Sequence, residues 1–240
     1  AALGYLDRKV LVYRCGGTII SDQFVLTAAH CIRKNYKPTI VRLGKASLLD
    51  ESNDTITAVM HNIQDIFVHP DYNATTMWND IALLQVIDKI IFNDLVSPAC
   101  LHSNLGDLPS NVPLTVTGWG TTDWRRSTTP SKYLLKVNLT SMPLEECKSK
   151  LITGPRVNDT SLRNGLFNGQ YCAYGDAEKD ACHGDSGGPL TYLRTNTSTI
   201  VGVVSFGYGC GLDIPSIYTR VSHYLDWIEP HVWSNLDNSN

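Results

Sequence analysis

A serine in a glycine-rich turn is the residue best suited to chemistry in this 240-residue sequence. Residues Gly184–Pro189 read Gly-Asp-Ser-Gly-Gly-Pro, and the serine is Ser186. A nucleophilic serine needs an exposed hydroxyl on a tight turn and backbone N–H groups free to hold a developing oxyanion. The glycines permit such a turn and the close approach of a substrate. Six fixed residues arise by chance in only about a few per million chains of this length, so an ordinary glycine-rich turn is the weaker interpretation.

A nucleophilic serine also needs a base, and His30 has a suitable setting. Small residues precede it, and Cys31 follows it and would fix the backbone through a disulfide. A lone histidine is usually structural, and the other six histidines lack such a setting. The third candidate is Asp80, which leads directly into the apolar run Ile81–Leu84 and is well placed for burial. A buried Asp80 would accept a hydrogen bond from His30 and fix its tautomer.

The elements that must position these residues are expected to be strands. Short apolar or β-branched runs recur between turn residues, and most have strand length. They are Lys9–Tyr13, Thr18–Ile20, Phe24–Leu26, Thr39–Leu43, Thr55–Val59, Ile81–Val86, Leu114–Thr117, Leu134–Leu139, Pro189–Leu193 and Ile200–Ser205. Only the tail, Ser222–Trp233, predicts a helix, with Ser222 as its N-cap. Many short strands without alternating helices indicate an all-β barrel or sandwich, and the loop Leu101–Pro113 is the best candidate for a linker between two halves.

Composition argues against several functional classes. Hydrophobic residues make up 42% of the chain and charged residues 18%, which permits a large core and disfavours disorder. The net charge is −3, whereas a nucleic-acid binder would usually be basic, so we expect no nucleic-acid partner. No apolar run approaches the roughly 18 residues needed to span a membrane, and no signal-peptide pattern opens the sequence. We therefore expect no membrane partner. We expect no cofactor, and no metal site either, because no His/Glu cluster has metal-ligand spacing.

Cysteines and glycosylation sequons favour the secretory route. The seven cysteines contain no C-x-x-C pair and are dispersed, which suggests disulfides formed in an oxidising compartment. Five sequons begin at Asn53, Asn73, Asn138, Asn158 and Asn196. The odd cysteine must be free or bonded to something outside this chain. We therefore expect a secreted, extracellular glycoprotein.

Three segments resemble those of the chymotrypsin–trypsin family of serine proteases: Thr27–Cys31, Asp80–Leu84 and Gly184–Pro189. Their order, His before Asp before Ser, is that of chymotrypsin and unlike that of subtilisin or the α/β-hydrolases. The resemblance runs nearly the full length, with further matches at Cys15–Gly17, Thr117–Gly120, Ser205–Gly207 and Tyr218–Val221. It implies two packed antiparallel Greek-key β-barrels with a C-terminal α-helix. The N-terminal barrel, residues 1–105, would carry His30 and Asp80, and the C-terminal barrel, residues 106–240, would carry Asp180 and Ser186.

The resemblance implies a role for each matching residue. Ser186 is the nucleophile, His30 the general base and then acid, and Asp80 the orienting carboxylate, while the N–H groups of Gly184 and Ser186 form the oxyanion hole. Asp180 takes the place of the acid that pairs with Arg or Lys of the substrate in trypsin-like members. The other implied substrate-binding residues are Ser205, Phe206, Gly207 and Ser216. The implied activity is that of a secreted trypsin-like endopeptidase, activated from a zymogen, that cleaves after Arg or Lys through an acyl-enzyme.

The sequence departs from the family pattern at three places. The family's active chain begins with an Ile-Val-Gly-Gly-like segment, expected upstream of Ala1, whose α-amino group pairs with the aspartate matching Asp185. Ser216 replaces a glycine of the pocket wall, and it should narrow the pocket while its hydroxyl bonds Asp180 or the substrate cation. Lys45 stands where calcium-binding trypsins have their first ligand, so we expect no calcium requirement.

The resemblance also implies disulfides between Cys15 and Cys31, Cys147 and Cys172, and Cys182 and Cys210. Cys100 is left over. In two-chain relatives, such as arthropod clip-domain and vertebrate coagulation-type proteases, the matching cysteine tethers the protease domain to an upstream light chain. We therefore expect Cys100 to be bonded to a light chain or clip-type domain, with a free buried thiol as the alternative. Protein or peptide substrates and serpin-type inhibitors are the other expected partners.

Two other functions compete with an active protease. A non-catalytic protease homologue that serves as a cascade cofactor usually lacks a triad residue. All three are present here, although Ser216 and the missing N-terminal segment keep that alternative open. A metal-dependent hydrolase is disfavoured by the lack of a ligand cluster. Covalent labelling of Ser186 would separate an active protease from a non-catalytic homologue.

Overall fold

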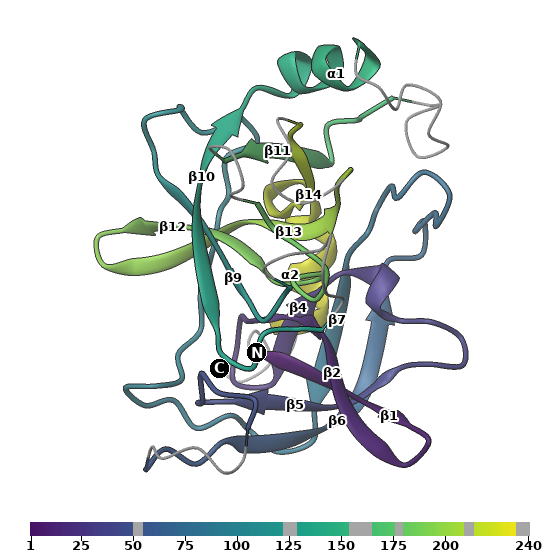
Figure 1. The fold of residues 1–240 in the computed structure, drawn as a ribbon, viewed down its shortest axis with the longest axis vertical. Helices are drawn as coiled ribbons and strands as arrows, with labels where there is room; N and C mark the ends of the chain where they lie inside the picture. Colours follow the sequence, from purple (N-terminus) through teal and green to yellow (C-terminus); the bar gives the residue numbers. More distant parts are fainter. Residues whose placement is uncertain (50–54, 122–128, 154–164, 176–179, 209–213, 234–240) are drawn as a thin grey trace.

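The structure is a computed structural model that describes residues 1–49, 55–121, 129–153, 165–175, 180–208 and 214–233. Within these ranges the strands form two seven-stranded sheets, one from each half of the chain (Figure 1). The first sheet contains β1 (Ala2–Asp7), β2 (Val10–Gly16), β3 (Thr18–Ile19), β4 (Phe24–Thr27), β5 (Pro38–Leu43), β6 (Val59–Val68) and β7 (Ala82–Val86). The second contains β8 (Cys100–Leu101), β9 (Leu114–Gly118), β10 (Leu135–Met142), β11 (Gln170–Tyr174), β12 (Pro189–Arg194), β13 (Thr197–Phe206) and β14 (Ser216–Arg220). The helical elements are η1 (Ala29–Cys31), α1 (Leu144–Thr153), η3 (Val221–Tyr224) and α2 (Leu225–Trp233).

Both sheets are antiparallel apart from one short pairing. The first runs in the order β2-β1-β5-β6-β7-β4-β3, and the second in the order β12-β9-β10-β11-β14-β13-β8. A further pairing between β12 and β13 closes six strands of the second sheet into a barrel, to which β8 adds a parallel strand. The predicted all-β fold with a C-terminal helix is therefore confirmed. The division into domains 1–105 and 106–240 stays a prediction.

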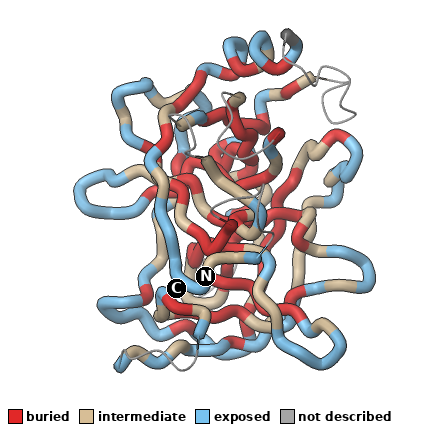
Figure 2. The backbone as a smooth tube through the Cα atoms, viewed as in Figure 1, coloured by how far each residue is buried: buried red, intermediate tan, exposed pale blue. Residues whose placement is uncertain are grey.

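A shared core joins the two sheets and the C-terminal helix. Leu26 and Leu83 of the first sheet, Ile200 and Val203 of the second, and Ile228 of α2 form one buried cluster. All of them are fully buried or nearly so, and buried residues concentrate between the sheets (Figure 2). Each such side chain contributes about 1.5–3 kcal/mol of burial free energy, so the cluster fixes the sheets relative to each other. This matters for the site, because its residues come from both sheets.

Two expectations about the elements were wrong. Residues 55–58 are not in a strand, and β6 instead begins at Val59 and continues to Val68. Polar residues (His61, Asn62, Gln64 and Asp65) interrupt it, so it lacks the continuous apolar run that marks the other strands. The tail is not the only helix among the described residues, because α1 covers Leu144–Thr153. Its buried residues Leu144, Cys147 and Leu151 recur at helical spacing within a highly charged segment, which hid the pattern.

The C-terminal helix lies where the sequence predicts it, but it begins differently. Residues Val221–Tyr224 form the 3₁₀ helix η3, and α2 follows from Leu225. Ser222 is a buried member of η3 rather than an N-cap, and its hydroxyl has no partner among the described residues. No helix in the described ranges is both long and apolar enough to cross a membrane.

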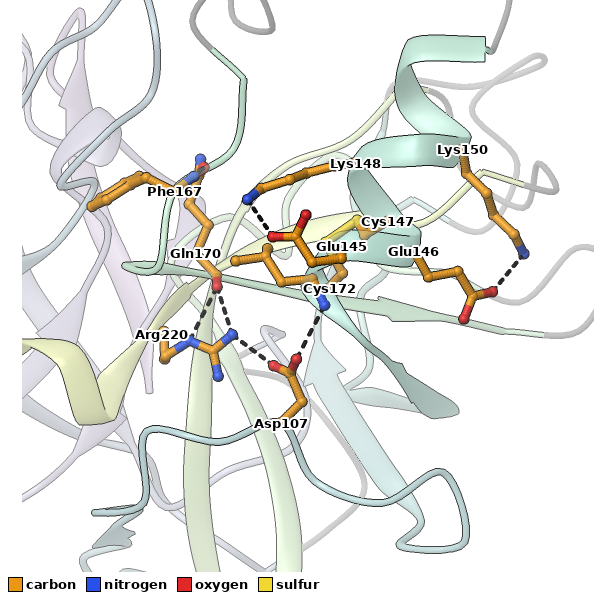
Figure 3. The surroundings of a disulfide bond; sticks show 11 residues. Asp107, Glu145, Glu146, Cys147, Lys148, Lys150, Phe167, Gln170, Cys172 and Arg220 are labelled. Atoms are coloured by element: carbon orange, nitrogen blue, oxygen red, sulfur yellow. Dashed lines mark hydrogen bonds and ion pairs between the residues drawn. A yellow bond between two sulfur atoms is a disulfide. The ribbon is translucent and has the colours of Figure 1, made fainter.

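A buried arginine ties the loop between the sheets to β14 and α1 (Figure 3). Arg220 is 3% exposed, and its guanidinium donates to the carbonyl of Gln170 at 2.9 Å and to Asp107 Oδ1 at 2.6 Å. Asp107 Oδ2 accepts from the N–H of Leu144 at 3.0 Å and so caps α1. A disulfide from Cys147 to Cys172 fastens the helix to β11. Together these contacts hold β14, whose first residue is Ser216, against the rest of the second barrel.

Candidate active site

A buried carboxylate and a half-buried imidazole form the centre of the site. Asp80 is 0% exposed, and its Oδ2 lies 2.7 Å from Nδ1 of His30. Its Oδ1 accepts from the backbone N–H of His30 at 2.8 Å, and Oδ2 also accepts from the hydroxyl of Ser205 at 2.5 Å. An ionised carboxylate only accepts hydrogen bonds, so Nδ1 must carry the proton. The neutral ring then presents Nε2 as a proton acceptor, as a general base requires.

Asp80 is held by residues of the second half of the chain. It lies two residues before β7, and the hydroxyl of Thr219 in β14 donates to its carbonyl at 2.7 Å. The preceding residue, Asn79, has a positive φ of 57°, and its side-chain oxygen accepts from the Tyr224 hydroxyl at 2.9 Å. Asparagine tolerates that left-handed conformation better than most residues. The carboxylate is therefore positioned jointly by the first sheet, the second sheet and η3.

His30 lies in η1 and is fixed by its neighbour. The disulfide between Cys15 and Cys31 joins η1 to the end of β2, and the Tyr5 hydroxyl donates to the Cys31 carbonyl at 3.0 Å. Possible metal-ligand atoms of Cys15, His30 and Cys31 lie within 4.8 Å of one another. Both sulfurs are bonded to each other, and Nδ1 of His30 faces Asp80, so this group does not have the free ligands that a zinc site needs.

The turn that carries Ser186 packs against the first sheet. The carbonyl of Ser186 accepts from the N–H of Gly16 at 2.8 Å. At Gly187, φ is +73° and an added Cβ would lie 2.2 Å from the Thr27 hydroxyl, so only glycine fits there. These contacts place the serine beside the segment that leads into His30. No hydrogen bond joins the Ser186 hydroxyl to His30 Nε2 in the described part of the chain, and such bonds often tighten only when substrate binds.

Two backbone donors at the serine turn are free. The N–H groups of Gly184 and Ser186 donate to no group in the ranges that the structure describes. Gly184 has a φ of +106° and packs closely on Gly120, where an added Cβ would come within 3.0 Å of backbone. Unused donors beside a candidate nucleophile are the arrangement that an oxyanion hole needs.

Asp185 is a second buried carboxylate, adjacent to the candidate nucleophile. It is 9% exposed, and its two oxygens accept from the N–H groups of Gly120 at 2.8 Å and Cys182 at 2.9 Å. Burial raises the pKa of Asp185, and these two hydrogen bonds oppose the shift. No ion pair to Asp185 occurs among the described residues. Gly118 and Gly120 leave the room it fills, since a Cβ on either would meet its oxygens.

A third acid, Asp180, lies with polar groups of β14. Its Oδ1 accepts from the Ser216 hydroxyl at 2.7 Å. Across from it, a Cβ on Gly207 would lie 2.9 Å from the same hydroxyl, so Ser216 lies between Asp180 and Gly207.

Desolvation by burial, followed by the charges of Asp180 and Asp185, raises the pKa of Tyr218, whose fully buried hydroxyl has no partner in the described ranges. Phe206 is half-buried at the end of β13, and Gly207 is exposed.

The predicted cysteine and glycosylation residues are placed as follows. The Cys15–Cys31 and Cys147–Cys172 disulfides are present, and Cys182 is disulfide-bonded. Cys210 lies outside the described residues. Cys100 is a free cysteine and is exposed, so the alternative of a buried thiol is wrong. Of the sequons, Asn73, Asn138 and Asn196 are exposed, and Asn53 and Asn158 lie outside the described residues.

Sequence reasoning missed several residues that complete the site. Thr219 and Tyr224 hold the Asp80 segment, and Gly120 holds Asp185. Tyr218 adds a buried hydroxyl near Asp180 that has no partner among the described residues. Three of these, Gly120, Tyr218 and Thr219, lie in segments recognised only as family matches, Thr117–Gly120 and Tyr218–Val221. A polar residue inside an otherwise apolar strand is the signal that could have found Thr219.

Comparisons with known proteins agree with this geometry. The sequence matches the family described as Trypsin over residues 5–228. It is 40% identical over 238 residues to the serine protease Hayan of Drosophila melanogaster, which covers 97% of this chain and 37% of that protein. It is 38% identical over 221 residues to a trypsin of Phaedon cochleariae, with 89% and 77% covered.

A third relative is the phenoloxidase-activating enzyme of Bombyx mori, which is 36% identical over 251 residues. That match covers 93% of this chain and 55% of the relative. The chain therefore spans well under two thirds of Hayan and of the Bombyx mori enzyme.

Proposed function

The chain belongs to the trypsin family of serine proteases, and we propose that it is the catalytic part of a secreted endopeptidase that cleaves after Arg or Lys. The observation that carries the proposal is the pairing of the fully buried Asp80 carboxylate with Nδ1 of His30 at 2.7 Å. This pairing leaves Nε2 as the base on the side of the ring away from Asp80. Few structural roles would require an ionisable pair of that kind beside a glycine-rich serine turn.

The proposed mechanism is acyl transfer in two halves. His30 Nε2 removes the proton of the Ser186 hydroxyl as its oxygen attacks the substrate carbonyl, and the N–H groups of Gly184 and Ser186 stabilise the oxyanion. Asp80 stabilises the imidazolium that forms. His30 then gives its proton to the leaving amine, and water repeats the sequence on the acyl-enzyme. Ser205 supports the step indirectly, because its hydroxyl donates to Asp80.

The proposed specificity rests on the acid at Asp180. A guanidinium or ammonium group from the substrate would form a charge-assisted hydrogen bond with its carboxylate, and an apolar residue would offer no such group. Tyr218 and Ser216 add hydroxyl groups nearby. Because the Ser216 hydroxyl donates its proton to Asp180, its oxygen keeps the capacity to accept a hydrogen bond from a substrate cation. Backbone groups of Ser205 and Gly207, beside Phe206, would pair with the extended substrate.

Activation is proposed to act through Asp185. A buried carboxylate held only by backbone donors in the described residues would be stabilised by a cationic partner, and an α-amino group created by cleavage would serve. Pairing would fix the Gly184–Ser186 turn and with it the oxyanion donors. An exposed Cys100 is compatible with a disulfide to an upstream light chain or clip-type domain. The relatives named Hayan and phenoloxidase-activating enzyme support a place in a protease cascade, with serpin-type inhibitors as further partners.

The test compares wild type with Ser186→Ala on an Arg ester, using activated full-length protein. We expect the variant to lose most of an enhancement of about 10⁶-fold, because the triad acts as a unit. A library of peptides should show preference for Arg or Lys before the cleaved bond. Equal turnover by the variant would reject the catalytic assignment and favour the non-catalytic homologue. Preference for aromatic residues would reject the role of Asp180 alone.

A further inference from the structure

Positive charge is concentrated in the first part of the chain. Residues 1–49 contain eight Lys and Arg against two Asp, a net charge of +6 within a chain whose net charge is −3. Six of the eight cations are exposed: Arg8, Lys9, Arg14, Arg33, Lys34 and Lys37. We call these six residues the basic edge. They lie on the β1–β2 hairpin and on the turn between η1 and β5.

The two segments of the basic edge are neighbours in space. Tyr5 of β1 pairs with Pro38 of β5, so Lys37 lies next to the end of β1. The guanidinium of Arg14 lies 5.1 Å from the ring centroid of Tyr36, which in turn stacks on Tyr5 at 4.9 Å. Arg8 and Lys9 form the tip of the hairpin, with positive φ at both residues. Figure 1 shows the hairpin and the 32–37 turn projecting on the same side of the first sheet.

Among the residues that the structure describes, little of this charge is neutralised. Arg14 pairs with Asp7 at 2.9 Å, and both side chains are largely exposed. In the described ranges, no ion pair involves any of the other five cations. Clustered like charges repel one another and attract an anionic partner, and the field they create extends about 8–10 Å at ordinary ionic strength. The basic edge therefore favours a ligand with several negative charges.

The basic edge adjoins His30 and the turn that carries Ser186. Arg14 is followed by Cys15, whose disulfide reaches Cys31 beside His30, and by Gly16, whose N–H donates to the Ser186 carbonyl. The proposed specificity pocket lies on the second sheet. In the proposed mechanism His30 gives its proton to the leaving amine, so the substrate residues after the cleaved bond must lie on the His30 side of the serine, which is the side of the first sheet. The residues after the cleaved bond would thus approach the basic edge.

We propose that the basic edge binds an acidic stretch of the protein substrate located just after the bond that is cleaved. This inference rests on the proposed function and adds a substrate class to it: Arg or Lys before the bond, and several Asp or Glu after it. The attraction acts on both encounter and binding, so it raises kcat/KM for such substrates and weakens as salt is added. Substrates that end at the cleaved bond gain nothing from it.

The experiment uses activated full-length protein and peptides that are identical up to an Arg before the cleaved bond. After the bond, one peptide carries four Glu, the second four Gln and the third four Lys. At low ionic strength we expect kcat/KM to be at least about 5-fold higher for the Glu peptide than for the Gln peptide, and lowest for the Lys peptide. The preference should shrink toward unity at about 0.5 M salt.

Two variants with the same change in charge supply the control. Lys34→Glu with Lys37→Glu should abolish the preference, while Lys136→Glu with Arg194→Glu should preserve it. Lys136 and Arg194 are exposed on β10 and β12, and the β12–β13 hairpin lies on the opposite side of the molecule (Figure 1). Both variants should hydrolyse an Arg ester as wild type does, which shows that they are folded and active.

Two outcomes would overturn the inference. One is equal cleavage of the Glu and Gln peptides by wild type, and the other is a preference that survives in the Lys34/Lys37 variant. If equal cleavage is accompanied by retention on immobilised heparin that the variant loses, the basic edge binds a sulfated polysaccharide instead. Failure of the proposed function would give a different result, because neither wild type nor either double variant would then hydrolyse the Arg ester.

Discussion

Two buried aspartates, Asp80 and Asp185, differ in the hydrogen-bond partners that compensate the burial of their carboxylates. Asp80 is 0% exposed and accepts from the backbone and ring of His30 and from the Ser205 hydroxyl. Asp185 is 9% exposed and accepts only from two backbone N–H groups in the described residues. A buried charge costs several kcal/mol unless charge or hydrogen bonds compensate it. The first site is therefore complete within this chain, and the second is suited to receive a cation.

This difference implies that the two aspartates serve parts of the site that become functional at different stages. The proposed His30–Asp80 pair can act as soon as the chain folds, whereas the proposed oxyanion donors beside Asp185 depend on whether that carboxylate is paired. Regulation would then act on the turn around Ser186 and leave the base untouched. This agrees with the positions of the two groups: Asp80 is held by three elements, while Asp185 lies within the turn itself.

Asp80→Asn gives the largest effect in this comparison. The amide would favour the wrong tautomer of His30, and kcat on an Arg ester should fall by about 10⁴-fold. The fold should persist, because the substitution keeps the size of the side chain, and circular dichroism checks this. A loss of less than tenfold would mean that the buried pair is structural.

Asp185→Asn should have a smaller effect on catalysis. Without a charge to bind the activating cation, the oxyanion donors are not fixed, and kcat should fall by about 10²–10³-fold or more. The control is labelling of His30 by an affinity reagent for Arg-specific proteases, which should continue because the base is unaffected. Wild-type kcat in the variant would contradict the proposed activation.

Ser216→Gly should change specificity and leave both aspartate sites intact. Removing the hydroxymethyl widens the proposed pocket and frees Asp180 from the 2.7 Å hydrogen bond. Relief of crowding of about 1–3 kcal/mol corresponds to roughly 5- to 150-fold in rate, so kcat/KM on Arg and Lys substrates should rise. Ser216→Ala separates the two causes, since it removes the hydroxyl and keeps most of the bulk. Unchanged or lower rates in the glycine variant would show that the pocket tolerates the serine.

The pH dependence of stability gives the smallest effect. Because burial raises the pKa of Asp185 above its usual value of 3.8, its stabilising contribution is complete below that value and is lost as the pH rises through the folded pKa. The unfolding free energy of the protein, minus that of Asp185→Asn, should therefore decrease as the pH rises from 3. Denaturant titrations in a Ser186→Ala background, which prevents self-cleavage, measure this difference. A difference that increases with pH would mean that Asp185 is already paired.

Much of the fold and of the candidate site could be predicted from local sequence, and the remainder depends on distant contacts. The tight turn at Ser186 and the burial of Asp80 could be predicted, because the glycines around Ser186 and the apolar run after Asp80 are their immediate neighbours in sequence. The Thr219 and Tyr224 contacts to the Asp80 segment span more than 130 positions, so no local pattern reports them. The strand β6 and the helix α1 were missed because polar residues dominate their exposed faces. The serine at position 216 was recognised as unusual, but only the structure shows which atom it bonds.

The most direct test of the account is covalent labelling of Ser186. Activated full-length protein is treated with a fluorophosphonate, and the labelled peptide is identified by mass spectrometry, beside His30→Ala and a heat-denatured sample. The account predicts stoichiometric labelling of Ser186 alone, and near-complete loss of labelling in His30→Ala and after denaturation. Labelling at another serine, or none in an activated and folded sample, would contradict it.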